Sequence, residues 1–419
     1  MLRNYLLMAL AMLRRKKFLT FVNIFATTLT LTVLVVVAAF SAAKLYPRGA
    51  ERGSGNFLVV DNVCFQGGTE ENQSTWNSGP GFRFYRDYIA PLEAPDRVSF
   101  ASRTSAAVSY VDGRKVESQL RRTDGAYWEI LAFDFLEGGP LTAADHDSGR
   151  FVAVINRAAR DALLGGGPAV RRSITANGQT FTVVGVVENE PESNEVAFAD
   201  IWVPLTTAPS SGYREQWLGN GVALLWTADS DRRGAIKREY RDRLAAFEYE
   251  DPERYHTARS VAETRLDNLA NLFVDDWCTS ETHLARFAGI ATVLILAFML
   301  LPAINMINLN VSRILERAPE IGLRKAAGAT RRSLVIQFIL ENLVLTAVGG
   351  LVAFGLTPWV LDIINDTVIE YGQLTMNWRV FVAGLFFVAV FAVFSGAYPA
   401  WRMARLEPVQ ALRGGTRNA

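Results

Sequence analysis

The chain has 419 residues, half of them hydrophobic, and a formal net charge of +1. This near-neutral balance gives no electrostatic indication of nucleic-acid binding. The three histidines and two cysteines are scattered and do not form the ligand cluster that a zinc site requires. No combination of Ser, His and Asp, or of Cys and His, indicates a catalytic site. We therefore expect no enzyme activity, metal or cofactor in this chain.

Four apolar segments are each long enough to cross a bilayer as a helix, which takes about 20 residues. They occupy residues 18–43, 284–310, 333–356 and 379–399. The first could instead be a secretory signal peptide, but it exceeds the roughly 7–15 apolar residues of such a peptide. Buried helices of a soluble protein are the other alternative. We predict an integral membrane α-helical protein with four transmembrane helices and a large α+β extracytoplasmic domain inserted between helices one and two.

The charges of the connecting segments predict the orientation. Residues 1–17 carry five basic residues and no acidic one, residues 311–332 carry six basic and two acidic, and residues 400–419 carry four basic and one acidic. Residues 357–378 carry three acidic residues and no basic one, and residues 44–283 carry 35 acidic and 26 basic residues. Because cytoplasmic flanks are enriched in Lys and Arg, the first three segments are predicted to be cytoplasmic and the other two external.

The external segment, residues 44–283, alternates short β-type runs with turns and helical stretches, which predicts an α+β fold. Asn177-Gly178 predicts a hairpin between two of the runs, because Asn-Gly suits a two-residue turn. A buried strand at residues 151–155 is expected to lead into a helix at residues 156–164. Residues 256–273 are expected to form one helix.

Cys64 and Cys278 lie near the two ends of this external segment, which must converge at the membrane. Disulfides persist outside the cytoplasm, so a disulfide between them is one interpretation. Two free buried thiols are the other, and the sequence leaves both open.

The segment at residues 311–332 carries the most information about function. As a short helix, the segment is predicted to be amphipathic, with Ile314, Leu315, Ile321 and Leu323 on one side while Arg and Glu side chains face water. Pro319 interrupts such a helix, and Gly328 permits the turn back into the membrane. A basic loop that lies at anionic lipid headgroups would have the same composition.

The segment contains a pattern formed by Glu316, Arg317, Glu320, Ile321, Gly322, Leu323, Arg324, Lys325 and Gly328. With this pattern it resembles the cytoplasmic loop of MacB/FtsX-type ABC transporter permeases, also called the type VII or mechanotransmission group, although Pro319 departs from the pattern. Residues 127–139 are similar to part of the family's periplasmic core domain, and residues 396–413 are similar to its C-terminal signature. In such proteins the loop forms a coupling helix that docks on the ATPase subunit, so the resemblance implies an ATPase-coupling role for these residues.

The resemblance implies a permease subunit of the bacterial cytoplasmic (inner) membrane that drives efflux or export. Its partners would be two copies of an ABC ATPase subunit and a second permease copy, in a homodimer or a related heterodimer. A periplasmic adaptor or outer-membrane component is a further candidate partner. The P-loop pattern is absent from the 419 residues, so the partner ATPase would bind ATP and Mg²⁺.

Three other functions stay open at this point. One is lipoprotein release, as in Lol-type relatives. Another is FtsX-like regulation of a cell-wall hydrolase without transport, and the third is a plain receptor or scaffold. The size of residues 44–283 favours the exporter-like group, because FtsX-type outer domains are usually smaller.

Glu341 is the only acidic residue inside the four predicted spans. A carboxylate at the bilayer centre costs about 2.5–3.5 kcal/mol, so such residues usually find a polar partner or a wet cavity. Asn305 and Asn308, which share one face of the preceding helix, are candidate partners, as are basic residues near the cytoplasmic side. We predict that Glu341 faces protein; an acid that reaches the headgroups or is protonated is the alternative.

Overall fold

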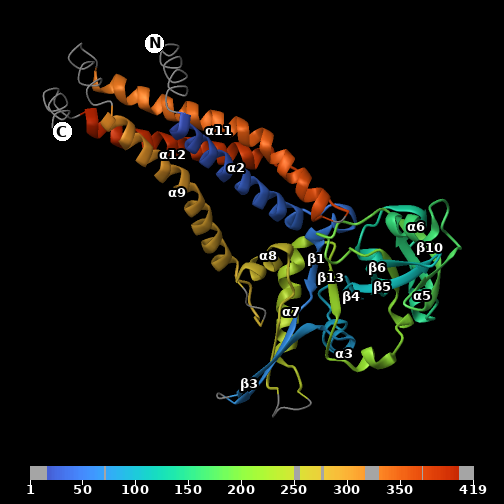
Figure 1. The fold of residues 1–419 in the computed structure, drawn as a ribbon. Helices are drawn as coiled ribbons and strands as arrows, with labels where there is room; N and C mark the ends of the chain where they lie inside the picture. Colours follow the sequence, from blue (N-terminus) through green and yellow to red (C-terminus); the bar gives the residue numbers. More distant parts are fainter. Residues whose placement is uncertain are drawn as a thin grey trace. The chain divides into compact units, whose positions relative to one another are not determined.

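The computed structural model describes residues 17–69, 72–249, 255–274, 278–316, 330–369 and 371–404. The chain divides into two compact units (Figure 1). The helical unit comprises Met1–Phe40, Gly289–Thr367 and Leu374–Ala419. The β-sheet unit comprises Ser41–Ala288 and Val368–Gln373. Each unit is described by itself below.

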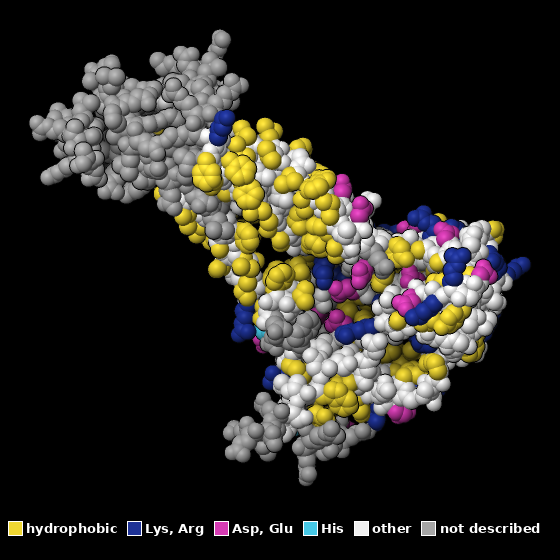
Figure 2. Space-filling model, in the orientation of Figure 1, with side chains coloured by type: hydrophobic (Ala, Val, Ile, Leu, Met, Phe, Trp, Pro, Cys, Tyr) yellow, Lys and Arg dark blue, Asp and Glu magenta, His cyan; other side chains and the backbone are white. Residues whose placement is uncertain are grey.

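Among the described residues, the long helices are α2 (Lys17–Leu45), α9 (Leu284–Glu316), α11 (Arg331–Thr367) and α12 (Trp378–Ala404). By length and composition α2 and α11 could cross a membrane, and shorter apolar stretches occupy Leu284–Leu300 of α9 and Trp378–Phe394 of α12. Hydrophobic side chains cover much of the visible surface of these helices (Figure 2).

The helices extend beyond the apolar segments that predicted them. α11 runs to Thr367, so residues 357–367 of the expected external loop are helical. α9 likewise continues to Glu316, past the predicted boundary at residue 310. The physical reason is that hydropathy marks only the part of a helix whose side chains favour lipid. Backbone hydrogen bonding can continue the helix beyond that part into water.

Small residues allow close approach within the helical unit. A Cβ atom on Gly349 of α11 would lie 2.8 Å from Cβ of Thr27 in α2. Thr28 Oγ1 donates to the Gly349 carbonyl oxygen at 3.0 Å, and Thr357 Oγ1 lies 3.4 Å from Thr32 Oγ1. In lipid, such close contacts and hydrogen bonds are what hold helices together. The apolar centre contains Leu31, Val35, Ala353, Phe381 and Val388.

The described part of the β-sheet unit is built on a ten-stranded mixed sheet with the strand order β1-β13-β4-β6-β11-β8-β10-β7; β5 pairs with β6, and β9 pairs with β10. β8 and β10 are parallel, as are β6 and β11, and the other pairs are antiparallel. The strands are β1 (Phe57–Val60), β4 (Arg97–Ser102), β5 (Ser105–Val111), β6 (Arg114–Thr123), β7 (Phe135–Gly138), β8 (Val152–Asn156), β9 (Ser173–Ala176), β10 (Gln179–Val187), β11 (Ile201–Pro204) and β13 (Gly221–Trp226).

A second sheet of four strands has the order β12-β3-β2-β14. Its strands are β2 (Val63–Thr69), β3 (Asn72–Pro80), β12 (Leu218–Gly219) and β14 (Thr257–Ser260). The α-helices described in this unit are α3 (Phe82–Phe84), α4 (Tyr127–Ile130), α5 (Ala143–Asp147), α6 (Arg157–Leu164), α7 (Arg233–Ala245) and α8 (Arg265–Val274). Aromatic side chains such as Phe65, Phe84 and Tyr240 fill the core around β2, α3 and α7. The unit is therefore α+β, as the sequence predicts.

The predictions that depend on local sequence pattern agree with the structure, whereas one element that depends on pairing with a distant strand was predicted wrongly. The hairpin at Asn177-Gly178 joins β9 and β10, and the buried strand β8 leads into α6. The single helix expected at residues 256–273 is wrong, because Thr257–Ser260 is a strand paired with β2 and the helix begins only at Arg265. Pairing with a distant strand overrides the local pattern here.

We expect Gly349→Leu to lower the stability of the full-length protein in detergent, because the added side chain collides with Thr27. Overpacking of this kind costs about 1–3 kcal/mol. Gly355→Leu is the matched control in the same helix, since a Cβ there meets nothing within 4 Å. The measurement is the apparent melting temperature of the two variants. An equal effect of both substitutions would contradict the proposed close contact.

Candidate functional site

The chain enters the β-sheet unit through residues 44–51, called here the first connector. Lys44, in the last turn of α2, pairs with Glu195 at 2.7 Å, and both side chains are about a third or more exposed. Such an exposed pair contributes little to stability, with a median of about 0–1 kcal/mol. The Arg48 carbonyl oxygen accepts a hydrogen bond from Asn194 Nδ2 at 2.6 Å. The buried part of the connector, which follows, is held more firmly.

Glu190 holds the turn of the first connector at Gly49. The backbone N–H of Ala50 donates to both Glu190 carboxylate oxygens, at 3.0 and 3.1 Å, and Asn194 Nδ2 donates to Oε2 at 2.9 Å. Burial raises the pKa of Glu190, and these donors oppose the shift. Gly49 has φ of +67°, and a Cβ there would lie 2.5 Å from Glu190 Oε2. The turn therefore requires glycine for two separate reasons.

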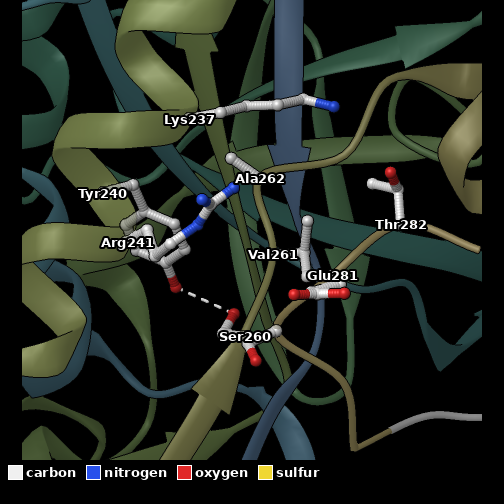
Figure 3. A pocket seen from close by; sticks show the side chains of 9 residues that line it. Lys237, Tyr240, Arg241, Ser260, Val261, Ala262, Glu281 and Thr282 are labelled. Carbon is white, nitrogen blue, oxygen red and sulfur yellow. Dashed lines mark hydrogen bonds between the residues drawn. The ribbon is translucent and has the colours of Figure 1, made fainter.

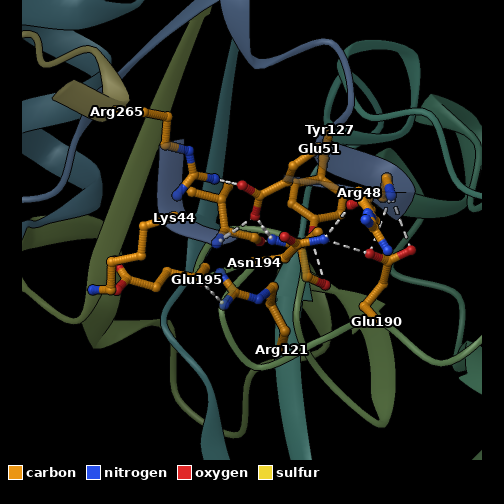
Figure 4. A network of polar contacts seen from close by, with 12 residues as sticks. Lys44, Arg48, Glu51, Arg121, Tyr127, Glu190, Asn194, Glu195 and Arg265 are labelled. Atoms are coloured by element: carbon orange, nitrogen blue, oxygen red, sulfur yellow. Dashed lines mark hydrogen bonds and ion pairs between the residues drawn. The ribbon is translucent and has the colours of Figure 1, made fainter. Parts of the chain in front are cut away.

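Glu51 joins the first connector to α8. Its side chain is fully buried, and Oε1 accepts hydrogen bonds from the backbone N–H groups of Val196 at 2.9 Å and Ala197 at 2.7 Å. Oε2 forms an ion pair with Arg265, the first residue of α8 (Figure 4). Burial lowers the pKa of Arg265 to about 10. This pair links two segments that are far apart in the sequence, within a site from which water is largely excluded.

The loop at residues 194–198 is held from the opposite side by β6 and α4. The fully buried Arg121 guanidinium donates to the carbonyl oxygens of Glu195 at 2.7 Å and Phe198 at 3.2 Å, and also to Ser102 at 2.9 Å (Figure 4). Tyr127 Oη donates to the Val196 carbonyl oxygen at 2.9 Å. Burial lowers the pKa of Arg121. Side chains thus bind both the N–H and the C=O groups of this loop.

A loop between α11 and α12 also reaches residues 194–198. Residues Val368–Gln373 belong to the β-sheet unit, although the helices on either side of them belong to the helical unit. The rings of Tyr371 and Phe198 lie 6.4 Å apart, centre to centre. The 194–198 loop is consequently in contact with two separate connections between the units.

The chain leaves the β-sheet unit through residues 278–283, called here the second connector. The structure joins Cys278 to Cys64 of β2 by a disulfide, with Cα atoms 5.3 Å apart. Arg259 Nη1 donates to the Cys278 carbonyl oxygen at 3.3 Å. The pairing that the sequence left open is therefore present, and it fixes the second connector to the four-stranded sheet.

The second connector lies beside a cavity of about 240 Å³. Lys237 and Arg241 of α7 face it, together with Glu281 of the connector (Figure 3). Tyr240 Oη donates to Ser260 Oγ at 2.8 Å across one wall. The connector thus rests against α7 and β14 as well as the disulfide.

A second cavity, of about 360 Å³, lies between the first connector and α8. Its polar lining includes Lys44, Asp61, Arg103, Arg121, Glu195, Glu263, Arg265 and Asn268. In the described part of the chain no three His, Cys, Asp or Glu side chains form a group that could hold a metal ion. Glu51, Glu190 and Arg121 bind backbone groups around the first connector, and Arg259 binds one in the second, so the arrangement is suited to holding chain segments in place.

The ATPase-coupling residues predicted from the sequence fall almost entirely outside the described residues. Glu316 is the last residue of α9, and its side chain is not among those described. The remaining coupling residues, Arg317, Glu320, Ile321, Gly322, Leu323, Arg324, Lys325 and Gly328, lie in the undescribed range 317–329. Their role stays a prediction.

Glu341 is buried in the helical unit, with 5% of its surface exposed. Gln337 Nε2, one turn earlier in α11, donates to Glu341 Oε1 at 3.3 Å. The side chains of the expected partners Asn305 and Asn308 lie outside the described residues. The structure thus surrounds Glu341 with protein and supplies a neighbour that the sequence reasoning did not name.

Two family models match the chain. The MacB-like periplasmic core domain matches residues 20–242, more than half of the chain, and the FtsX-like permease C-terminal domain matches residues 292–408. The chain belongs to the MacB/FtsX-type family of ABC transporter permeases. These matches confirm the resemblance noted in the sequence. They also confirm that the α+β domain is of the kind that this family has outside the cytoplasm.

The chain spans most of the length of one similar protein and about half of another. The uncharacterized ABC transporter permease YknZ of Bacillus subtilis (strain 168) is 23% identical over 384 residues, which is 91% of each chain. The macrolide export ATP-binding/permease protein MacB of Wolinella succinogenes is 27% identical over 78% of this chain, and the chain spans only 48% of it. The solved extracellular domain of YknZ from Gram-positive bacteria is 15% identical, with a TM-score of 0.36, and covers 48% of this chain and 98% of that one.

We expect Glu51→Gln to destabilise the protein by about 3–5 kcal/mol, because it leaves the buried Arg265 without its counter-charge. The amide oxygen of Gln can still accept from Val196 and Ala197, so the loss reports the charge. The double variant Glu51→Gln/Arg265→Met should recover part of the stability. Glu195→Gln, which breaks the exposed pair with Lys44, should cost at most about 1 kcal/mol. Apparent melting temperatures of the full chain test this, and a Glu51→Gln effect as small as that of Glu195→Gln would refute it.

Gly49→Ala should cost more stability than Gly165→Ala. Both glycines have left-handed backbones, with φ of +67° and +69°, but a Cβ at Gly165 meets nothing within 4 Å. The two substitutions therefore share the backbone strain of about 1–2 kcal/mol, and only Gly49→Ala adds the collision with Glu190. Thermal unfolding of both variants gives the difference. Equal losses would mean that Glu190 moves away freely and does not constrain the turn.

Proposed function

We propose that this chain is the permease subunit of an ABC transporter that relays ATP hydrolysis by a separate ATPase subunit to its extracytoplasmic domain and so drives export. The observation that carries the proposal is the order of the two matched domains, a MacB-like periplasmic core followed by an FtsX-like permease domain. The MacB relative has ATP-binding and permease functions in its name, and this chain spans about half of it.

The proposed topology has four membrane spans, with both termini in the cytoplasm. It is supported by the apolar helices α2 and α11, the shorter apolar stretches in α9 and α12, and the alternation of basic and acidic connecting segments. The grouping of Val368–Gln373 with the β-sheet unit agrees with this topology, because both would lie outside the membrane. The residues at 311–332 would then face the ATPase.

The two connectors suggest how motion would reach the β-sheet unit. Movement of α2 would act on the first connector, which Glu51 ties to α8, and movement of α9 would act on the second connector, which the disulfide ties to β2. We infer that two permease copies work with two ATPase subunits, and that an adaptor or outer-membrane component is a further partner where the envelope has an outer membrane. Export is favoured by the name of the MacB relative.

The test is charge reversal in the coupling segment. Glu316→Lys/Glu320→Lys should abolish stimulation of the partner ATPase by the permease in nanodiscs, while the protein still inserts into the membrane. Asp362→Lys/Asp366→Lys is the matched control, because it reverses the charge of two acids with the same spacing. These acids lie near the C-terminal end of α11, whereas the coupling segment precedes the N-terminal end of that helix. ATPase rates of the reconstituted complexes are the measurement. Full stimulation with the Glu316/Glu320 variant would overturn the coupling proposal.

A further inference from the structure

A pair of carboxyl groups lies where α8 meets the edge of the large sheet. Asp61 follows β1, and Glu263 lies in the turn between β14 and α8. Two backbone hydrogen bonds fix this turn to β1, from Val59 N to Glu263 O at 2.9 Å and from Glu263 N to Val59 O at 2.8 Å. The main chain of Glu263 is thus held firmly to β1, two residues before Asp61.

Two asparagines of α8 bind these carboxyl groups. Asn268 Nδ2 lies 3.5 Å from Asp61 Oδ2 and 3.2 Å from Glu263 Oε2, so one amide group serves both acids. Asn271 Nδ2 donates to Glu263 Oε1 at 2.6 Å. Asparagine amides of α8 therefore bind Asp61 Oδ2 and both oxygens of Glu263.

The cations around the pair are engaged elsewhere. Arg103 donates to the backbone carbonyl of Asp61 at 2.5 Å and not to its carboxylate. In the part of the chain that the structure describes, neither Asp61 nor Glu263 forms an ion pair. The other charged groups facing this region are Lys44 bound to Glu195, Arg265 bound to Glu51, Asp267 bound to Lys237, and Arg121 bound to carbonyl groups.

Burial and proximity make two negative charges here unfavourable. Burial raises the pKa of Glu263 from 4.5 to about 7, the charge of Asp61 adds to the shift, and the asparagine donors oppose it. Burial also raises the pKa of Asp61, which Arg103 opposes and Glu195 increases. Between pH 4.5 and about 7 the folded protein therefore holds a proton that the unfolded chain would release. Stability consequently falls as the pH rises through this window.

We propose that Asp61 and Glu263 together bind one proton that keeps α8 against β1, and that release of this proton to solvent loosens α8. The ionised pair would place two negative charges around the single Asn268 amide. Because α8 carries Arg265, the loosening also reaches the buried pair with Glu51. The β-sheet unit is an external domain exposed to the pH of its surroundings, whether or not the chain couples to an ATPase.

Infrared difference spectroscopy of the full chain in nanodiscs tests the proton directly. A protonated-carboxyl band should disappear with a midpoint near pH 7, as the pKa of Glu263 requires. Glu263→Gln should remove this band, and Asp61→Asn should move its midpoint to lower pH, because the neighbouring charge is gone. Glu215→Gln, at an exposed acid, is the control and should change neither. Absence of a titrating band that depends on Glu263 overturns the proposal.

Hydrogen exchange of residues 265–274 tests the loosening. After correction for intrinsic rates, protection of α8 should fall about 30-fold between pH 5.5 and pH 8.5, if opening of α8 returns the pKa of Glu263 from about 7 to 4.5. This dependence should vanish in Glu263→Gln and shrink in Asp61→Asn, so the test survives if either variant fails to fold. Protection that is equal at both pH values in the unmodified protein overturns the link between the proton and α8.

Discussion

The buried ion pair between Glu51 and Arg265 is the contact on which the arrangement of three distant segments of the β-sheet unit depends. In a site from which water is largely excluded, a guanidinium and a carboxylate stabilise the fold only while they remain paired and hydrogen-bonded. Removing either group leaves the charge of the other buried and uncompensated. Glu51 meets this demand by binding Val196 and Ala197 as well. The pair therefore fixes three segments together, the first connector, the 194–198 loop and α8, and none of them can shift alone.

The two connectors are held by different kinds of bond. The first relies on Glu190, Glu51 and backbone N–H groups, whose strength depends on exclusion of water. The second relies on the covalent bond between Cys64 and Cys278, which holds at any local polarity. The helical unit uses a third device, contacts of Gly349 with threonine side chains, which suits a solvent without a hydrophobic effect between helices.

The sequence predicted those features that depend on local pattern. Apolar segments indicated the long helices, Asn177-Gly178 indicated the β9–β10 hairpin, and motif residues indicated the family. It did not predict β14, which exists because of pairing with β2. The sequence also could not predict three long-range contacts, which join Glu51 to Arg265, Glu190 to the turn at Gly49, and Arg121 to the 194–198 loop. One charged residue among many carries no mark of a partner more than 70 residues away, and burial of a charge becomes visible only in the folded chain.

The position of the 194–198 loop makes several distant contacts depend on one short stretch of chain. Glu51 of the first connector binds it, Arg265 of α8 joins it through Glu51, and Tyr371 of the loop between α11 and α12 lies against Phe198. Three parts of the β-sheet unit that are far apart in the sequence thus meet at five residues. A substitution within this loop would therefore disturb all three at once, whereas a substitution at Tyr371 would disturb only its own contact.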